Sequence, residues 1–238
     1  MKKDLLDMAR RARADYAVGK IPFLAGLGDS EIEDFKELIE ERQFKKNQLI
    51  LHEEDTANYF YFIFSGKVKI IQLSAEGKEK ILAIHKKGDF FGEMAILDGG
   101  TAPATVVAIE NTRIGQISRE VFHRQVLSNN NALRGIIALL CGRLRNAWSM
   151  VKVMSFADAE HRVRAVLKYM AGQFGVAGPE GTLIEMKLTH ADIGNFASLT
   201  RETVSRMISR LEQAKEIEII DHKFILLKPA FQKKSDSL

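Results

Sequence analysis

The polar side chains that best match a known chemistry lie within residues 188–211, L-T-H-A-D-I-G-N-F-A-S-L-T-R-E-T-V-S-R-M-I-S-R-L. An arginine can donate two hydrogen bonds to guanine O6 and N7, and a glutamate can accept one from cytosine N4. The candidate contacts with DNA are Thr189, Thr200, Arg201, Glu202, Ser205 and Arg206. This set of side chains predicts the reading of base edges in a major groove.

Two short helices joined by a tight turn must position these side chains. Thr189 can cap the first helix, with Asp192 near its positive end, and Thr200 can cap the second. The inward face of the second helix carries apolar residues at i, i+4 and i+7, namely Val204, Ile208 and Leu211. The alternative is an ordinary helical hairpin, with Glu202 and Arg206 as a surface ion pair.

The segment T-R-E-T-V-S-R, residues 200–206, resembles the recognition helix of the CRP/FNR family of bacterial transcription regulators. The resemblance implies that three side chains read an inverted repeat with half-sites similar to TGTGA: Arg201, Glu202 and Arg206. The family usually has glycine in the turn, where this chain has Ser198. A serine at that position either adopts a positive φ at some cost or bends the turn differently.

Length and composition indicate a globular chain of one or two domains. The 238 residues are 46% hydrophobic, and no run of ~18 apolar residues is present to span a membrane. The N-terminal residues are too polar for a secretory signal. The single cysteine forbids an internal disulfide and a four-cysteine iron–sulfur cluster, which fits a cytoplasmic location. The net charge of +4 does not by itself indicate DNA binding. Residues 158–238, which contain the candidate DNA contacts, hold 12 Lys/Arg and 11 Asp/Glu, so their charges nearly balance.

The pattern of the chain predicts an α+β fold. Residues 1–20 are expected to form an amphipathic helix, and residues 30–40 a second helix capped by Ser30. From Phe44 to Ser118, short apolar runs between turn signals predict an antiparallel, jelly-roll-like β-roll. The expected domains are a helical extension at 1–20, the β-roll sensor at 21–127, a dimerisation helix at 128–156 and a winged helix-turn-helix at 157–238.

The C-terminal domain is expected to contain a helix at 158–173, ended by the glycine and proline residues of 172–179. Two short strands within 217–227 form the wing. The family usually has glycine before these strands, where this chain has Glu216.

Residues 128–155 are expected to form one long helix with an apolar stripe at heptad spacing. The stripe consists of Leu133, Ile137, Leu140, Leu144, Ala147, Val151 and Met154. Helix-turn-helix dimers bind two half-sites one turn of DNA apart, which favours a seam between two copies of this helix. The expected dimer interface is Leu133, Ile137, Leu140, Leu144, Val151 and Met154. The alternative is a helix that faces the core of its own chain.

Residues 88–108, G-D-F-F-G-E-M-A-I-L-D-G-G-T-A-P-A-T-V-V-A, resemble the phosphate-binding cassette of the same family. Cyclic-nucleotide binders have an Arg-Ser-Ala triplet there, and this chain has Ala102-Pro103-Ala104. Pro103 lacks both the hydroxyl and the backbone N–H, and Ala102 lacks the guanidinium. The resemblance also implies that Arg143 pairs with the cassette Glu93.

The expected effector pocket consists of Gly92, Glu93, Met94, Ala102, Pro103, Ala104, Thr105, Arg143, Ala147 and Trp148. Cyclic-AMP sensors of the family have Thr-Ser in place of Ala147-Trp148. These departures predict that the roll keeps its scaffold without binding cyclic AMP. Two roles are open for Trp148: it stacks on a planar ligand, or it packs in a core or an interface.

Haem is another candidate ligand, because some family members bind haem through histidine and His85 ends the apolar run I-L-A-I-H. A surface position for His85 is the alternative. No C-x-x-C-H motif is present for covalent attachment. Cys141 lies among leucines and is expected to be buried and inert. The six histidines have no metal-ligand spacing.

These observations predict a homodimeric, sequence-specific transcription regulator whose effector the sequence does not name. Its expected partners are double-stranded DNA and RNA polymerase, and neither an enzymatic activity nor a membrane is expected. One alternative is a cyclic-nucleotide-binding module of a kinase or channel, which would need no wing. A second is a cupin-like enzyme, which would need a metal cluster or paired acids in the roll. A third is a regulator that binds DNA without any effector.

Overall fold

The computed structural model describes residues 35–231 except 57, 157 and 222–223. The chain divides into two compact units, Met1–Arg143 and Leu144–Leu238, and each is described by itself. The helix expected at 1–20 and the cap expected at Ser30 lie outside the described residues. Among the helices that are described, none is long and apolar enough to cross a membrane.

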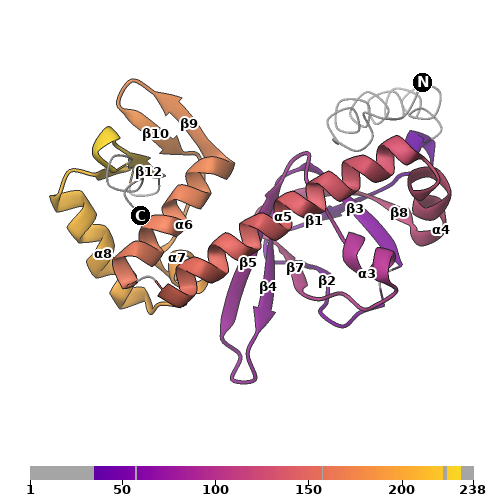
Figure 1. The fold of residues 1–238 in the computed structure, drawn as a ribbon, viewed down its shortest axis with the longest axis horizontal. Helices are drawn as coiled ribbons and strands as arrows, with labels where there is room; N and C mark the ends of the chain where they lie inside the picture. The colour runs from indigo at the N-terminus through magenta and orange to yellow at the C-terminus, as the bar shows by residue number, and fades with distance from the viewer. Residues whose placement is uncertain (1–34, 57, 157, 222–223, 232–238) are drawn as a thin grey trace. The chain divides into compact units, whose positions relative to one another are not determined.

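The first unit contains two four-stranded antiparallel sheets (Figure 1). The first sheet has the order β1 (Glu40–Phe44), β8 (Thr112–Ser118), β3 (Tyr59–Ser65), β6 (Phe90–Phe91). The second sheet has the order β2 (Leu49–Leu51), β7 (Thr105–Ala108), β4 (Lys67–Leu73), β5 (Glu79–Lys86). The expected antiparallel β-roll is therefore confirmed.

Strand β3 is buried on both faces, and it joins two apolar cores. Phe60, Phe62 and Phe64 point to one core, whereas Tyr61 and Ile63 point to the other, as the two-residue period of a strand requires. The Phe60 ring stacks on two further aromatic rings, with centroid distances of 5.0 Å to Phe90 and 4.6 Å to Phe122. The aromatic run thus fixes the centre of the roll.

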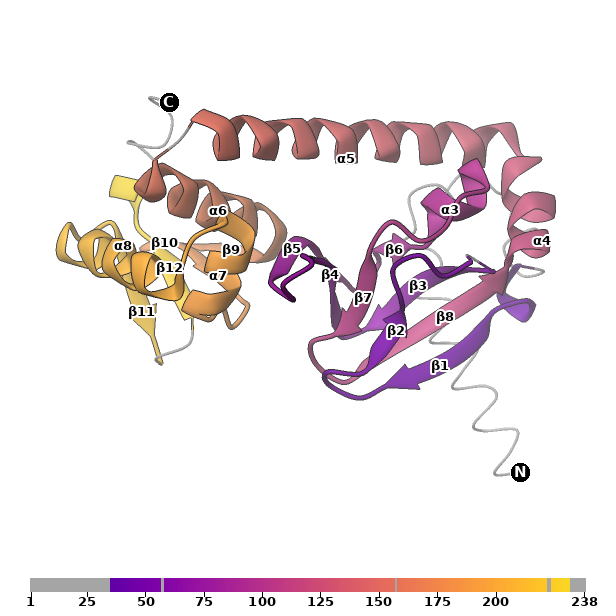
Figure 2. The same ribbon diagram turned by 90° about the horizontal axis from the view of Figure 1, so that it is seen from below.

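Helices cover one of these cores. They are α3 (Glu93–Asp98), α4 (Arg119–Phe122) with a following π-helical turn at His123–Leu127, and α5 (Asn130–Phe156). Figure 2 shows α3 beside the first half of α5. Ala132 and Ile136 of α5 are buried in the same core as Ala95 and Ile96 of α3. The expected long helix is confirmed, and it begins two residues later than expected.

The expected helix at 30–40 extends too far. Glu40 is the first residue of β1, where it pairs with Gln116 of β8, and the strands therefore begin before Phe44. The Gln116 amide also donates a 3.0 Å hydrogen bond to the Glu40 carboxylate. Pairing with a strand more than 70 residues away decides the conformation here, and local helical preference cannot reveal it.

Among its described residues, the second unit contains the end of α5, helices α6, α7 and α8, and a four-stranded sheet with the order β11-β12-β10-β9. Its elements are α6 (Ala159–Phe174), β9 (Gly175–Gly178), β10 (Gly181–Ile184), α7 (His190–Ala197), α8 (Arg201–Gln213), β11 (Ile217–Ile220) and β12 (Phe224–Leu227). The helix-turn-helix and the wing are confirmed. The β9–β10 hairpin was not expected, because its glycine-rich strands lack an alternating apolar pattern and β10 is held by pairing with β12.

Candidate nucleic-acid interface and sensor pocket

The two helices of the candidate DNA-binding motif are capped as expected. The Thr189 hydroxyl accepts a 3.0 Å hydrogen bond from the Asp192 N–H, and the Asp192 carboxylate accepts one of 3.0 Å from the Thr189 N–H. The Thr200 hydroxyl accepts a 3.2 Å bond from the Thr203 N–H. These bonds satisfy N–H groups that a helix start leaves without a backbone partner.

The turn between α7 and α8 has a left-handed serine at its corner. Ser198 has φ 53° and ψ 48°, so the first of the two expected alternatives is correct. The Leu199 N–H donates a 3.0 Å bond to the Gly194 carbonyl. A Cβ at Gly194 would lie 2.6 Å from the Leu199 carbonyl oxygen. The close turn therefore requires glycine at 194 and tolerates the strained serine at 198.

The two faces of α8 have opposite character. Val204, Ile208 and Leu211 are buried, as expected. The exposed residues include three of the proposed base readers, Arg201, Glu202 and Arg206, whereas Ser205 is half-buried. Since α8 presents a charged face on a capped, anchored helix, the arrangement suits insertion into a major groove.

A buried ion pair joins α6 to the start of the wing. An Arg164 Nη1–H donates to a Glu216 carboxylate oxygen at 2.5 Å, and Nη2 lies 2.8 Å from the Glu160 carboxylate. The hydrogen bond with Glu216 raises the pKa of Arg164. The Glu216 N–H and carbonyl also bond the end of α8 and Lys228. The departure from glycine at 216 is visible in the sequence, but the partner of Glu216 is not, because Arg164 lies 52 residues away.

The roll contains the expected contact between Arg143 and Glu93. Glu93 is 4% exposed at the start of α3, and Arg143 Nη1 donates to its carboxylate at 2.5 Å. Arg143 Nη2 also donates to the Phe90 carbonyl at 2.7 Å, and the guanidinium lies 4.5 Å from the centre of the Phe90 ring. Gly92 has φ 84° and leaves no room for a Cβ beside Tyr59. This arginine is therefore engaged by the protein itself.

The loop that replaces the Arg-Ser-Ala triplet bonds to its own chain. The Gln72 amide donates a 2.9 Å bond to the Pro103 carbonyl and lies 3.4 Å from the Glu53 carboxylate. The Thr105 hydroxyl accepts a 3.0 Å bond from the Glu53 N–H. The Gln72 amide thus lies beside Pro103, with the Glu53 carboxylate within its reach. A carboxylate there repels an anion.

The remaining expected pocket residues differ in exposure. Ala102 and Ala104 are buried, and Met94 is 51% exposed. Ala147 and Trp148 belong to the second unit, where both are exposed and Trp148 retains 65% of its surface. The structure brings Glu93 and Arg143 together in the roll.

His85 lies within β5 and is mostly covered, with 17% of its side chain exposed. Burial lowers the pKa of His85 to about 3, and the charge of Arg143 acts in the same direction. Its Nδ1 lies 3.9 Å from a carboxylate oxygen of Asp89, and burial raises the pKa of Asp89. A surface position for His85 is therefore wrong. Within the described residues, no group of three or more His, Cys, Asp or Glu side chains could hold a metal ion.

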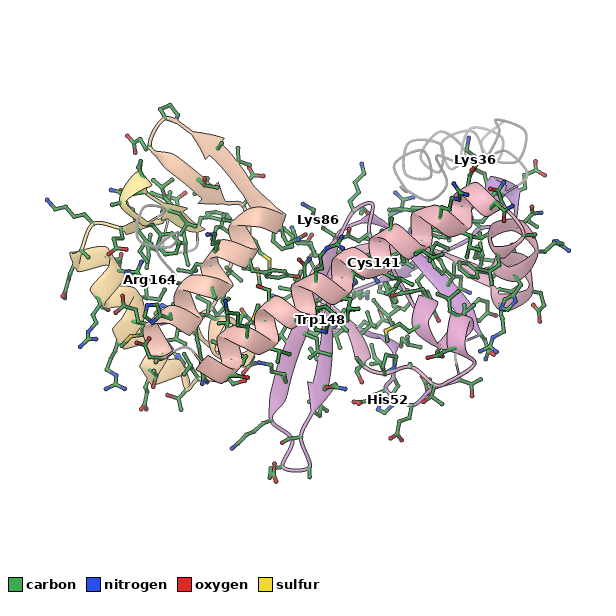
Figure 3. The ribbon with its side chains drawn as sticks, viewed as in Figure 1. Lys36, His52, Lys86, Cys141, Trp148 and Arg164 are labelled. Carbon is green, nitrogen blue, oxygen red and sulfur yellow. The ribbon has the colours of Figure 1, made fainter. Side chains whose placement is uncertain are left out.

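The expectation that Cys141 is buried is wrong, because the described chain exposes it. Figure 3 labels Cys141 and Trp148 along α5. The buried side of α5 is the one that carries Ala132 and Ile136, and Cys141 does not lie on it. Three further apolar residues of α5 are exposed, namely Ile137, Leu144 and Val151.

Comparison with known proteins matches both units. Residues 41–129 match the family model of the cyclic nucleotide-binding domain, and residues 161–230 match that of the Crp-like helix-turn-helix domain. The chain is similar to the cAMP-activated global transcriptional regulator CRP of Haemophilus influenzae, with 30% identity over 71% of this chain and 76% of the relative. It is also similar to the cyclic AMP receptor protein of Thermus thermophilus, with 29% identity over 81% and 86%.

A solved structure supports the same assignment. FixK2 from Bradyrhizobium japonicum superposes with a TM-score of 0.74 at 26% identity, covering 84% of this chain and 96% of that one. The relatives are transcription regulators rather than enzymes. The two domain matches occur in the order of the roll and the winged helix-turn-helix described above. The chain is thus a DNA-binding transcription regulator of the CRP/FNR family.

Proposed function

We propose that this regulator binds an inverted repeat as a homodimer and reads TGTGA-like half-sites through Arg201, Glu202 and Arg206. The observation that carries the proposal is the capped helix α8, which buries Val204 and Ile208 and exposes the three charged readers. RNA polymerase is the proposed protein partner at the promoter.

The proposed dimer seam is the exposed apolar stripe of α5. Ile137, Leu144, Trp148 and Val151 are 52%, 49%, 65% and 63% exposed. With Cys141 between them, their positions advance by alternating steps of four and three residues, which is the spacing of a two-helix seam. In the first unit, the other side of α5 packs against the roll core through Ala132 and Ile136, with Leu140 beside them.

The proposed partner of this stripe is the same stripe of a second copy of the chain. An inverted repeat has two half-sites, and each needs its own α8. Of the six residues expected at the seam, the exposed ones are Ile137, Leu144 and Val151. Leu133, Leu140 and Met154 are half-buried and flank the seam. Trp148 and Cys141 join the exposed stripe.

The proposed effector is not a cyclic nucleotide. Ala102 and Pro103 provide neither a positive charge nor a donor for a phosphate. The polar groups nearby, Gln72 and Glu53, bond to the chain itself. A regulator that binds DNA without any effector is the second candidate, and the Arg143–Glu93 pair within the described roll favours it because the roll satisfies its own buried charges.

Fluorescence anisotropy tests the proposed DNA reading. The full chain is titrated into a duplex with two inverted TGTGA half-sites centred one helical turn apart, and into a duplex of the same composition with both half-sites scrambled. Specific sites typically bind about a thousandfold or more tighter than non-specific DNA at physiological salt. Equal affinities for the two duplexes would contradict the proposal.

A further inference from the structure

Two hydroxyl groups at the start of α8 lie in line with one of the proposed base readers, Arg206. The Thr200 and Thr203 hydroxyl oxygens lie 2.9 Å apart. Arg206 Nη2 donates to the Thr203 hydroxyl oxygen at 3.4 Å. Thr200, Thr203 and Arg206 are three residues apart in turn, so they follow one side of the helix. Thr203 connects a cap that holds the start of α8 to a side chain that faces solvent.

The chemistry of the guanidinium fixes the direction of the bond between Arg206 and Thr203, whereas either hydroxyl of the Thr200–Thr203 pair can donate. A guanidinium is a donor and never an acceptor, so the Thr203 oxygen must accept from Arg206. The Thr200 oxygen already accepts from the Thr203 N–H at 3.2 Å and can accept the Thr203 hydroxyl proton as well. The hydroxyl bond with Thr200 favours one of the two rotamers that a threonine adopts in a helix. Thr203 therefore offers Arg206 an oxygen at a fixed place.

This contact leaves Arg206 able to bind a base. A guanidinium has five N–H groups, and Thr203 takes one of them. The other four include the pair that a guanine requires for two parallel bonds to O6 and N7. An exposed arginine otherwise samples many rotamers, and ordering it on binding costs affinity. The contact limits this sampling before DNA arrives.

We propose that Thr203 is a positioning residue for DNA recognition, which sets the orientation of Arg206 and thereby the strength of its preference for one base. This inference rests on the proposed role of Arg206 as a base reader and deepens it. Thr203 is half-buried, and it was not among the DNA contacts expected from the sequence. Its role follows from the bond to Arg206 rather than from any contact of its own with a base.

The test combines Thr203→Val, Thr203→Ser and Arg206→Ala in the full chain. Valine keeps the shape and removes the hydroxyl, whereas serine keeps the hydroxyl. Affinity is measured for the cognate inverted repeat and for duplexes altered at one base pair at a time. We expect T203V to reduce the preference for guanine at the position read by Arg206 by about fivefold, the effect of one hydrogen bond. The other positions should be unchanged, and T203S should restore the preference.

The double variant distinguishes positioning from a direct contact. If Thr203 acts through Arg206, T203V has no further effect in the R206A background. A uniform loss of affinity at every site would mean that the Thr203 hydroxyl contacts the DNA backbone, and additive losses at one base would mean that it reads that base itself. Either result overturns the proposal. If R206A alone leaves the guanine preference unchanged, the proposed reading by Arg206 fails instead, and the inference falls with it. Thermal unfolding of T203V confirms that the helix remains folded.

Discussion

Removing Glu202 should affect DNA binding differently from removing Arg201 or Arg206. A glutamate can contact a cytosine amine but is repelled by the DNA backbone, so its contribution is to discrimination rather than to overall affinity. Glu202 is exposed near the start of α8. Removing Glu202 should therefore lower the preference for one base without also removing an attraction to the DNA phosphates.

We expect Glu202→Ala to cost about 1–3 kcal/mol of discrimination at one base pair of each half-site. Binding isotherms for the cognate duplex and for its single-base variants measure this cost. Glu212→Ala is the matched control, because Glu212 is exposed on the last turn of the same helix. An E202A protein that keeps its full base preference would show that Glu202 does not read a base.

His85 makes the stability of the roll depend on pH. Its pKa of about 3 in the fold lies below the ordinary value of 6.5, so the unfolded chain binds the proton more readily. The stability contributed by neutral His85 is complete above pH 6.5 and is lost as the pH falls toward 3, with a slope of at most about 1.4 kcal/mol per pH unit. Asp89 has the opposite sign, because its raised pKa favours proton binding in the fold.

We expect His85→Gln to flatten the decline in stability between pH 6.5 and pH 4.5, since glutamine does not titrate. Urea unfolding at several pH values measures the slope. The comparison is made with Asp89 intact in both proteins, so that its contribution cancels. An unchanged slope in H85Q would show that His85 is protonated equally in the folded and unfolded chains.

At the scale of elements, α5 has two apolar sides with different partners. Within the first unit, Ala132 and Ile136 are buried in the same core as α3, whereas Ile137 and, further along the helix, Leu144, Trp148 and Val151 are exposed. Burying several such side chains is worth about 1.5–3 kcal/mol each, so an exposed stripe of this length favours association. The second copy of α5 is the partner that matches its length and spacing.

We expect Ile137→Asp with Leu144→Asp to give monomers, because the seam would then bury four unpaired carboxylates per dimer. Light scattering measures the mass. Asn146→Asp with Ser149→Asp adds the same charge at exposed positions of α5 outside the stripe and should leave a dimer. A folded I137D/L144D dimer would place the interface elsewhere.

The single cysteine gives an independent check of the register. In a parallel two-helix seam each residue of the stripe lies opposite its own copy, and a disulfide needs Cα atoms within about 7 Å. Mild oxidation should therefore link two chains through Cys141, the one cysteine of the sequence. A dimer in solution that forms no such link would contradict the register.

The elements that periodicity could predict are those held by local contacts. The capped helices around Thr189 and Thr200, the buried face at Val204 and the presence of the long helix α5 follow from spacing alone. The sequence did not reveal which side of α5 the roll covers, so Cys141 was expected inside. It also did not reveal the β1 start at Glu40 or the Arg164–Glu216 pair, since both depend on partners far along the chain.

At the scale of the whole molecule, the roll matches the cyclic nucleotide-binding domain, and we propose that its cassette has lost the phosphate ligands. The family match to residues 41–129 places the fold, but Ala102 and Pro103 remove the charge and the donor. Each lost charge-assisted bond is worth roughly 1.5–3 kcal/mol. A domain can thus keep its architecture while its ligand chemistry changes.

We expect calorimetry with cyclic AMP or cyclic GMP to show no binding tighter than about millimolar, or about 4 kcal/mol of affinity. The complementary variant Ala102→Arg with Pro103→Ser restores the missing ligands and should gain measurable affinity. Gln72→Ala with Glu53→Ala in the same background removes the competing polar groups and should increase it. Micromolar binding by the natural chain, with a matching rise in DNA affinity, would overturn this part of the account.

The most direct test of the central claim is selection of binding sites from random duplex DNA by the purified full chain, followed by sequencing. A homodimer that reads DNA through α8 should enrich an inverted repeat with a guanine-containing, TGTGA-like motif in each half and with the half-site centres about one helical turn, or 10 base pairs, apart. The same selection with E202A should lose information at one position of each half. Enrichment of a motif without two-fold symmetry, or of none, would contradict a homodimer that reads DNA through α8.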